Sequence, residues 1–236
     1  MRPGPTSGDL LVIVAVDREA DAARGAIDDA GLAGRVDVVS SGVGRVNAAV
    51  TLVRTLLGRA KAPAAILNTG VAGALASADP PDIGDTVIAA ASVYHEEGLV
   101  HEDGFSNLAD MGFPLIRGAE GNRLPAHPGL ASAAVGALPH ATLGVIATVA
   151  TCSGTDAHAE EVRGRTRAVA EAMEGAAVLH TAGIMGIPAI EIRTISNSTG
   201  DRGRQRWDLD HALARLRVDL AVALPHLLDT APSRGG

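Results

Sequence analysis

The sequence predicts an α/β protein: a three-layer α/β/α sandwich around a twisted, mixed but largely parallel central sheet. Short apolar runs of strand length alternate with segments of helical periodicity along the chain. Hydrophobic residues make up 47% of the sequence but aromatic residues only 2%, so we expect a core of Ala, Val, Leu and Ile. The 236 residues suit one domain spanning residues 1–236, with flexible tails at about 1–8 and 231–236.

The strands are expected where apolar and β-branched residues run together. The run 10–16 is typical of a buried parallel strand, because it is continuously apolar and stops at charged residues. The run 86–94 is longer and starts with β-branched residues. The predicted strands, in chain order, are residues 10–16, 36–40, 64–67, 86–94, 143–151 and 187–195.

The segments between these strands are expected to be helices, at residues 18–30, 46–57, 158–170 and 173–185. Gly31 is a suitable end for the first of them. Asp208 is a good N-cap for a closing helix, in which leucines recur at helical spacing and should pack on the sheet. Gly-rich turns are predicted at 42–44 and 70–73, and a long polar loop at 97–127.

Composition and spacing exclude several classes of protein. The net charge is −7 without a basic stripe, so we expect no nucleic-acid partner. The run 10–16 is too short to span a bilayer, so we expect no membrane segment. A single cysteine, Cys152, allows neither an intrachain disulfide nor a cysteine metal cluster, which fits a reducing cytoplasm.

No metal or other cofactor is predicted either. No two histidines stand four apart on a helix, and His95 has no second histidine at ligand spacing. Residues 41–47 resemble a dinucleotide fingerprint, but Asn47 stands where the third glycine belongs, so a tight turn is the better interpretation. Cys152 follows an apolar strand without a positive neighbour, so we expect it to pack against a ligand or the core and not to act as a nucleophile.

Ligands of such folds bind at the carboxyl ends of the strands. That rule selects short segments after each predicted strand, at residues 17–19, 42–44, 70–73, 94–95, 151–153 and 196–197. The acids Glu19 and Glu174 each stand near the start of a predicted helix close to this edge. Either alone is more often a helix-start residue than a catalyst, but with Arg193 and Asn197 they can form a site.

Four sequence blocks, in order, resemble the nucleoside phosphorylase and nucleosidase superfamily: NTGVAG at 68–73, IGDTV at 83–87, EAMEG at 171–175 and RTISN at 193–197. The resemblance extends from about residue 12 to 224. It is strongest toward methylthioadenosine/adenosylhomocysteine nucleosidases and the related futalosine hydrolases. It implies a cofactor-free enzyme that cleaves a purine nucleoside, and a homodimer or higher homo-oligomer.

The resemblance also implies roles for individual residues. Glu19 matches the acid that activates water, Glu174 the carboxylate that binds the ribose hydroxyls, and Asn197 stands where the adenine-releasing enzymes have an aspartate. Met173 is implied to pack under the sugar, Arg193 to hold Glu174, and Phe105 to reach a neighbouring subunit. The remaining residues expected to bind substrate lie at the same strand ends: Val71, Ala72, Gly73, Cys152, Ser153 and Ser196.

These residue types fit cleavage of a ribosyl C–N bond, which passes through an oxocarbenium-like sugar. Water needs a general base, the cationic sugar needs a carboxylate, and the departing purine needs hydrogen bonds. The amide of Asn197 suits a 6-oxopurine better than adenine, which favours release of hypoxanthine. Phosphorylases of the superfamily hold phosphate with an arginine and a hydroxyl where this chain has Asn68 and Val71, so hydrolysis is favoured, although Arg45 leaves phosphate binding open.

Three arginines follow Asn197 closely: Arg202, Arg204 and Arg206. They form either a solvated loop or a clamp for an acidic 5′ substituent of the nucleoside. Futalosine carries a benzoate there, so the prediction is hydrolysis of futalosine to hypoxanthine and dehypoxanthine futalosine, a step of menaquinone biosynthesis. The alternatives are a methylthioadenosine/adenosylhomocysteine nucleosidase, a purine nucleoside phosphorylase and a non-catalytic nucleoside-binding protein.

Overall fold

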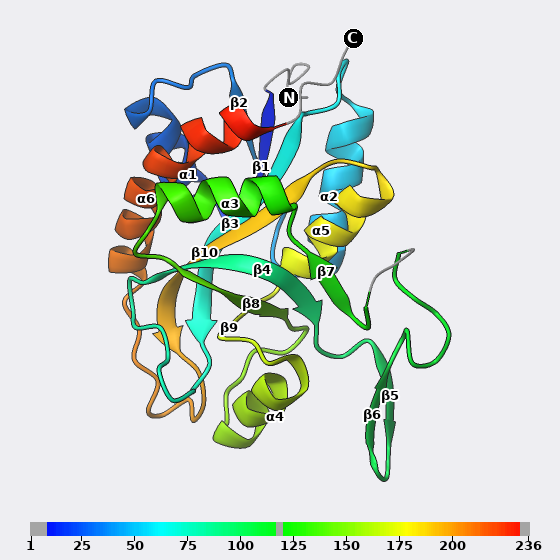
Figure 1. The fold of residues 1–236 in the computed structure, drawn as a ribbon. Coiled ribbons are helices and arrows are strands. Elements are labelled where there is room, and N and C mark those ends of the chain that lie inside the picture. The colour runs from blue at the N-terminus through cyan, green and yellow to red at the C-terminus, as the bar shows by residue number, and fades with distance from the viewer. Residues whose placement is uncertain (1–8, 117–119, 232–236) are drawn as a thin grey trace.

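The computed structural model describes residues 9–116 and 120–231, so most of the predicted tails, 1–8 and 232–236, lie outside the described residues. The described chain forms one eight-stranded sheet enclosed by helices, with a small hairpin at one side (Figure 1). The strands of the sheet are β1 (Leu10–Val14), β2 (Val36–Ser40), β3 (Ala65–Ala74), β4 (Thr86–Tyr94), β7 (Arg123–Pro125), β8 (Thr142–Thr148), β9 (Ala170–Ala172) and β10 (Ala189–Ser198).

The sheet is mixed and largely parallel, as predicted. The parallel pairs are β1–β2, β1–β3 and β3–β10 in one part of the sheet, and β4–β8 and β8–β9 in the other. The antiparallel pairs are β10–β4, β3–β9 and β4–β7. Because β10 pairs with both β3 and β4, the strands β3, β9, β8, β4 and β10 close into a ring, with β1 and β2 extending from β3.

Helices cover both faces of the sheet (Figure 1). The helices α1 (Asp17–Asp29), α3 (Pro128–Ala137) and α6 (Leu209–Thr230) share one apolar cluster with β1, β3 and β10. The helices α2 (Arg45–Leu57) and α5 (Gly175–Ile184) share a second cluster on the other side. The helix α4 (Asp156–Thr166) lies at one end and packs on β8 through Val162 and Ala159. These clusters consist mainly of aliphatic side chains, as the composition predicts, with Tyr94 as an aromatic member of the second.

Most predicted elements are present, with altered bounds. Asp208 caps α6 as expected, because its side chain accepts a hydrogen bond from the His211 amide. The turn predicted at 70–73 is wrong: these residues are part of β3, which pairs with β10 along its length. The helix predicted over 158–170 ends at Thr166, since residues 170–172 form β9. The helix α3 was not predicted.

The segment 97–127 is not a plain loop. It contains an antiparallel hairpin of β5 (Gly98–His101) and β6 (Gly104–Asn107), which projects from the body of the molecule (Figure 1), and then β7 at the rim of the sheet. None of the helices in the described parts of the chain is both long and apolar enough to cross a bilayer.

Candidate active site

The predicted site residues gather where β3 and β10 run side by side. In the parallel register, Arg193 lies opposite Gly70 and Asn197 lies opposite Gly73. All five strands of the ring, β3, β4, β8, β9 and β10, carry buried polar residues. The pairing therefore brings the two blocks NTGVAG and RTISN, more than a hundred residues apart in sequence, onto neighbouring strands.

Glu19 lies in the first turn of α1 and is only 3% exposed. Its Oε2 accepts hydrogen bonds from the amides of Ala15 at 2.9 Å and Val16 at 3.2 Å, and its Oε1 accepts one from Val71 at 2.9 Å. Three backbone amide donors hold the carboxylate in one orientation. Gly70 leaves it room: a Cβ there would stand 2.3 Å from Oε1.

Arg193 is the buried centre of the site. Its guanidinium donates to Glu191 at 2.8 Å, to Asn68 at 2.6 Å, to Glu174 at 3.1 Å and to the Val71 carbonyl at 3.3 Å. Burial opposes its charge, but the attraction of nearby carboxylates, Glu191 foremost, outweighs burial and raises its pKa. Arg193 is therefore a fixed cation that holds other groups.

Glu174 occupies the N-cap position of α5 and is 3% exposed. One carboxylate oxygen accepts from the Gly44 amide at 2.9 Å, and the other accepts from Arg193. Gly44 has a φ of +97°, which a glycine adopts without strain. The turn at 42–44, predicted as a tight turn at a ligand-binding strand end, thus positions a candidate catalytic carboxylate.

Glu191 is also part of this network, although no sequence motif predicted it. It is fully buried on β10, two residues before Arg193 and on the same face of the strand, and it accepts hydrogen bonds from Arg193 and from the Ser92 hydroxyl. Burial raises the pKa of its carboxyl group. A Cβ at Gly175 would lie 1.9 Å from its Oε2, so the space for Glu191 depends on that glycine. The signal available in the sequence was an acid at strand spacing from an arginine inside an apolar run.

Asn197 is 8% exposed near the end of β10. Its Oδ1 accepts from the Ser196 hydroxyl at 2.9 Å, and its Nδ2 donates to the Ser198 carbonyl at 3.0 Å. Ser196 also donates to the Ala72 carbonyl at 3.3 Å, so this hydroxyl supports the amide from within the sheet. A Cβ at Gly73 would come within 3.1 Å of the amide nitrogen.

The segment after β8 lies next to this network. Cys152 is exposed as a residue, but the surrounding protein partly shields its sulfur from solvent. This desolvation, and then the charges of Glu171 and Glu174, raise the pKa of the thiol, which disfavours a thiolate nucleophile. Ser153 donates both its amide and its hydroxyl to Glu171, at 2.7 Å and 2.6 Å. Met173 is half-buried and packs against the apolar cluster under α4.

The three arginines after Asn197 differ in their partners. Arg204 pairs with Asp156 and Asp201, and Arg206 pairs with Asp82 at 2.8 Å. Arg202 has no carboxylate partner among the residues that the structure describes; its guanidinium lies 4.9 Å from the centre of the Trp207 ring. Trp207 forms a β-bridge with Asn197, so the loop returns to the site beside the amide.

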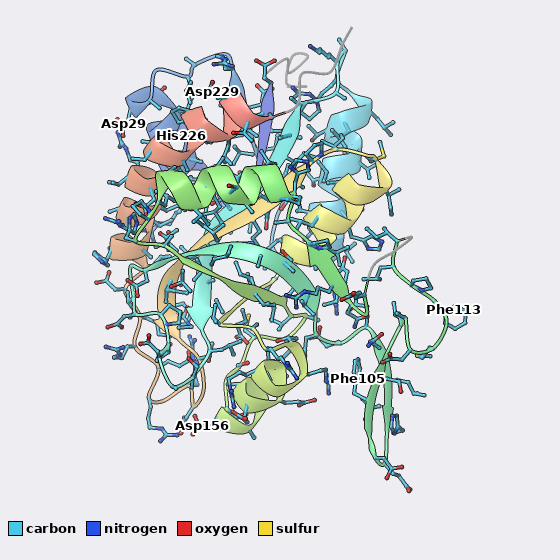
Figure 2. The ribbon with its side chains drawn as sticks, in the orientation of Figure 1. Asp29, Phe105, Phe113, Asp156, His226 and Asp229 are labelled. Carbon is cyan, nitrogen blue, oxygen red and sulfur yellow. The ribbon has the colours of Figure 1, made fainter. Side chains whose placement is uncertain are left out.

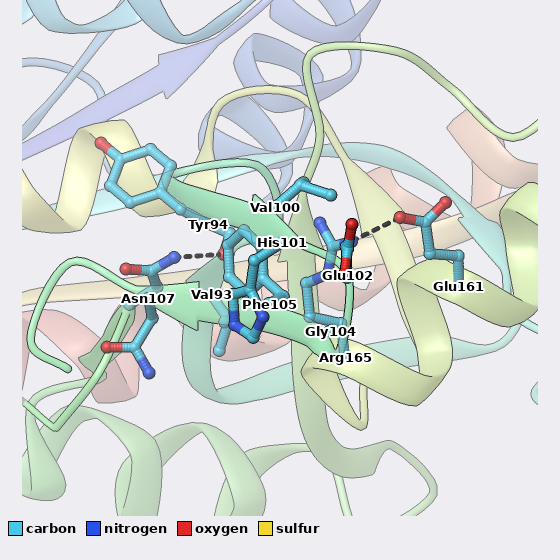
Figure 3. A pocket seen from close by; sticks show the side chains of 11 residues that line it. Val93, Tyr94, Val100, His101, Glu102, Gly104, Phe105, Asn107, Glu161 and Arg165 are labelled. Carbon is cyan, nitrogen blue, oxygen red and sulfur yellow. Dashed lines mark hydrogen bonds and ion pairs between the residues drawn. The ribbon is translucent and has the colours of Figure 1, made fainter. Parts of the chain in front are cut away.

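Phe105, on β6, lies within its own chain under Arg165, whose guanidinium is 4.0 Å from the ring centre. Both residues line a pocket of about 640 Å³ between the hairpin and α4 (Figure 3). Glu19, Glu174 and Asn197 do not line it. The other phenylalanine, Phe113, is 67% exposed and stands at the outer side of the molecule (Figure 2). The structure therefore does not bring Phe105 to the carboxylates of its own chain.

Two groups considered for phosphate binding are already engaged. Asn68 is fully buried, donates to the Ile13 carbonyl at 3.0 Å and accepts from Arg193. Arg45 pairs with Glu97 at 2.6 Å and Glu96 at 3.3 Å. Neither side chain faces the site as an unpaired donor.

The comparisons with known proteins agree with this geometry. A family model described as the phosphorylase superfamily matches residues 22–225. The chain belongs to the phosphorylase superfamily. It is 36% identical to a futalosine hydrolase of Acidothermus cellulolyticus, over 90% of this chain and 88% of that protein, and 33% identical to one of Streptomyces coelicolor, over 83% and 81%. A 5′-methylthioadenosine/S-adenosylhomocysteine nucleosidase of Mycobacterium bovis is 30% identical over 70% of this chain and 71% of that protein.

Solved structures of the phosphorylase superfamily share the fold. The native futalosine hydrolase of Helicobacter pylori matches with a TM-score of 0.70 and 21% identity, covering 93% of this chain and 97% of that one. A methylthioadenosine nucleosidase of Neisseria meningitidis matches with a TM-score of 0.70 and 23% identity, covering 92% and 97%. The predicted fold, the predicted superfamily and the resemblance to futalosine hydrolases are confirmed.

Proposed function

We propose that this superfamily member hydrolyses the N-glycosidic bond of futalosine and releases hypoxanthine. The observation that carries the proposal is the buried network in which Arg193 joins Glu174 to the Val71 segment that holds Glu19. It places a candidate general base and a candidate sugar-binding carboxylate around one fixed cation. Similarity to two futalosine hydrolases over more than four-fifths of the chain supports the substrate.

Glu19 is proposed to activate the attacking water. Oε2 accepts two of the amide donors and Oε1 only one, so a free lone pair remains on Oε1, and a carboxylate accepting three N–H groups is held rigidly for proton transfer. Holding the base in place contributes to the rate because the water is already oriented when the sugar becomes cationic.

Glu174 is proposed to bind the ribose hydroxyls and to stabilise the positive charge that develops on the sugar. The Gly44 amide and Arg193 each occupy one side of its carboxylate, so its orientation is fixed before substrate binds. Arg193 and Glu191 act on it as positioning residues. Met173, half-buried just before Glu174, is proposed to pack under the sugar.

Asn197 is proposed to hydrogen-bond the departing base. An amide offers both a donor and an acceptor at every pH, which suits a 6-oxopurine with an acceptor at O6 and a proton at N7. The Asn197 amide uses one lone pair for Ser196 and one N–H for Ser198, so its second N–H and second lone pair remain for the purine. The strand ends that carry Val71, Ala72, Gly73, Cys152 and Ser153 are proposed to form the rest of the base and sugar pocket.

Water is favoured over phosphate as the nucleophile. The positions that would neutralise a phosphate dianion hold Asn68, which is buried and bonded, and Val71, whose amide is occupied by Glu19. Arg45 is balanced by two glutamates. A reaction rate that is independent of phosphate follows from this arrangement.

The deciding experiment measures the free base by chromatography after incubation with futalosine, methylthioadenosine or inosine, with and without phosphate. We expect hypoxanthine from futalosine at a rate that phosphate does not change. Glu19→Gln should reduce turnover about 10²–10⁴-fold. Asp17→Asn is the matched control, since Asp17 is exposed in the same helical turn and bonds to Ser40. Full turnover by Glu19→Gln would remove Glu19 from the mechanism.

A methylthioadenosine nucleosidase is the second candidate, favoured by the 30% identity to the mycobacterial enzyme. The distinguishing residue is Asn197, because a protonated aspartate there would donate to N7 of adenine. Asn197→Asp should lower futalosine hydrolysis and raise adenine release. Adenine release by the unchanged protein would favour this candidate and reject selection by Asn197.

We also propose that the protein is a homodimer. The exposed faces of α2 and α5 lie side by side and carry large apolar side chains: Val46, Val50, Leu57, Ile184 and Met185. Val46, Val50 and Ile184 line a pocket of about 310 Å³ between the two helices. Exposed apolar side chains gathered around such a pocket are typical of a subunit interface. Because Cys152 is a free, exposed thiol, we propose the reducing cytoplasm as its compartment.

A further inference from the structure

Three side chains with metal-binding atoms meet beside α4, outside the network around Arg193. His95 follows β4 directly, and His158 and Glu161 stand one turn apart on α4. One ligand atom from each lies within 4.8 Å of the others. Their spacing in sequence gives no sign of this, because the pairing of β4 with β8 is what carries His95 to the start of α4.

The contacts of His158 define which of its nitrogens carries a proton. Its Nε2 lies 3.1 Å from the Thr151 carbonyl, an acceptor, so Nε2–H is the donor there. In the neutral ring Nδ1 then has a lone pair, and Nδ1 lies 3.7 Å from Oε2 of Glu161. Two acceptors facing each other repel unless a cation lies between them. A backbone carbonyl behind a ligating histidine is the usual second-shell arrangement of metal sites.

His95 supplies the second observation. Its side chain is 1% exposed, and its Nδ1 is buried without a hydrogen-bond partner among the described residues. Such a nitrogen costs free energy unless something binds it. The ring centres of His95 and His158 are 5.7 Å apart, at an interplanar angle of 73°.

Arg165 connects two of the three cluster residues, Glu161 and His95. Glu161 divides its two oxygens: Oε1 pairs with Arg165, whereas Oε2 faces His158. Arg165 also donates to the His95 carbonyl at 3.1 Å and so fixes the backbone of that residue (Figure 3 shows the pair of Arg165 and Glu161).

We propose that His95, His158 and Glu161 bind a divalent transition-metal ion, for which zinc is the best match. Two imidazoles and one carboxylate are ligands that zinc accepts, and they leave a fourth position for water. At Zn–N and Zn–O distances of about 2.0–2.2 Å, the ligand atoms would stand ~3.4 Å apart, so binding draws the side chains together slightly. The ion would tie the end of β4, the Thr151 segment and α4 to one another. Its role is structural, since Glu19 and Glu174 are not among its ligands.

The test uses the full-length protein stripped with EDTA and dialysed, and it does not depend on the nucleoside. We expect one equivalent of Zn²⁺ to bind by titration calorimetry and, in excess, to raise Tm by about 5 °C or more, with no effect of Mg²⁺. Co²⁺ should give visible absorption bands of a four-coordinate site.

His158→Ala and Glu161→Gln should abolish the Zn²⁺ effect and the Co²⁺ bands, while both proteins still fold because these side chains are partly exposed. His226→Ala is the matched control, as His226 is exposed on α6 (Figure 2), and it should bind Zn²⁺ like the unchanged protein. Absence of Zn²⁺ binding, or equal binding by His158→Ala, would overturn the proposal.

Discussion

At the scale of single residues, the site depends on glycines as much as on carboxylates. Gly70 has a φ of +144° and faces both Glu19 and Arg193, which a Cβ would approach to 2.3 Å and 2.9 Å. Gly175 leaves the space that Glu191 fills. These glycines allow buried charged groups to approach the backbone closely, where amide donors can hold them.

Replacement of Gly70 by alanine should therefore disable the enzyme without unfolding it. The new methyl group would displace the Glu19 carboxylate from the Val71 amide, and a misplaced general base costs about 10²-fold or more in turnover. Gly136→Ala is the control, because Gly136 lies in α3 with no atom within 4 Å of its Cβ position, and it should stabilise the helix by about 0.5–1 kcal/mol. The measurement is kcat with Tm for both variants. Retained kcat in Gly70→Ala would contradict the assignment of Glu19.

The sequence was informative about individual site residues where motifs were complete. Glu19, Glu174 and Arg193 were singled out, and the structure joins them: Arg193 contacts Glu174 directly and is linked to Glu19 through the backbone of Val71. Glu191 was missed because a single acid in an apolar strand has no motif, and only its burial against Arg193 reveals its partner. Of the three arginines, the sequence could not separate Arg202 from Arg204 and Arg206, because their partners lie in distant segments.

At the scale of elements, the sequence indicated the strands and helices better than their ends. Residues 70–73 were expected to turn, because glycine usually interrupts strands. They remain extended because β10 supplies hydrogen bonds along the whole of β3. The helix α3 begins at Pro128, a favourable first position, but its Ala- and Gly-rich sequence has little amphipathic pattern. The three residues of β9 were too few for any periodicity to identify.

The buried carboxyl group of Glu171 on β9, which accepts hydrogen bonds from Ser153 in the segment before α4, should make the free energy of unfolding depend on pH. Burial raises the pKa of Glu171 above its unfolded value of about 4.3, although Ser153 donates two hydrogen bonds to it. Its protonated form stabilises the fold below the unfolded pKa, and that contribution is lost as pH rises through the folded pKa. The Glu171→Gln variant keeps a neutral side chain, so its stability should exceed that of the unchanged protein increasingly as pH rises over this interval.

Urea denaturation midpoints between pH 4.5 and 8 measure this difference. Glu160→Gln is a control in which the substitution should lower, and not raise, stability as pH rises, because a hydrogen bond from Arg163 lowers the pKa of this exposed residue on α4. Its effect should be small, since both groups are exposed to solvent. A difference between Glu171→Gln and the unchanged protein that stays constant with pH would contradict a raised pKa at Glu171.

The loop between β10 and α6 should select the acidic substituent of the substrate through one arginine. Arg202 stacks on Trp207 without a carboxylate partner among the described residues, whereas Arg204 and Arg206 are paired within the chain. Arg202→Ala should raise KM for futalosine about 10-fold or more, as expected for loss of one charge-assisted hydrogen bond, and leave inosine cleavage unchanged.

Arg204→Ala and Arg206→Ala are the matched controls for this loop and should change KM for futalosine much less. Equal losses for futalosine and inosine in Arg202→Ala would instead place Arg202 against the base, which its position beside the Trp207–Asn197 bridge also allows.

At the scale of the whole molecule, the two faces of the sheet are covered differently. The helices α1, α3 and α6 pack together over β1, β3 and β10 and bury most of their leucines. The helices α2 and α5 bury smaller side chains and leave Val46 72% exposed, Leu57 75% exposed and Ile184 67% exposed. Because α5 begins at Glu174 and α2 follows Gly44, the same two helices hold a candidate catalytic carboxylate. An interface on their outer face would therefore support the site from behind.

The apolar face of α2 and α5 should thus control both assembly and activity. Val46→Glu or Ile184→Glu places a charge in the proposed interface, where its desolvation opposes association, and should convert a dimer to a monomer with reduced kcat/KM. Val218→Glu is the matched control, since Val218 is 54% exposed on α6 at the opposite side of the sheet, and it should stay dimeric and active. Light scattering coupled to gel filtration gives the mass of each variant. A monomeric unchanged protein would reject the dimer, and a dimer that persists in both charged variants would place its interface elsewhere.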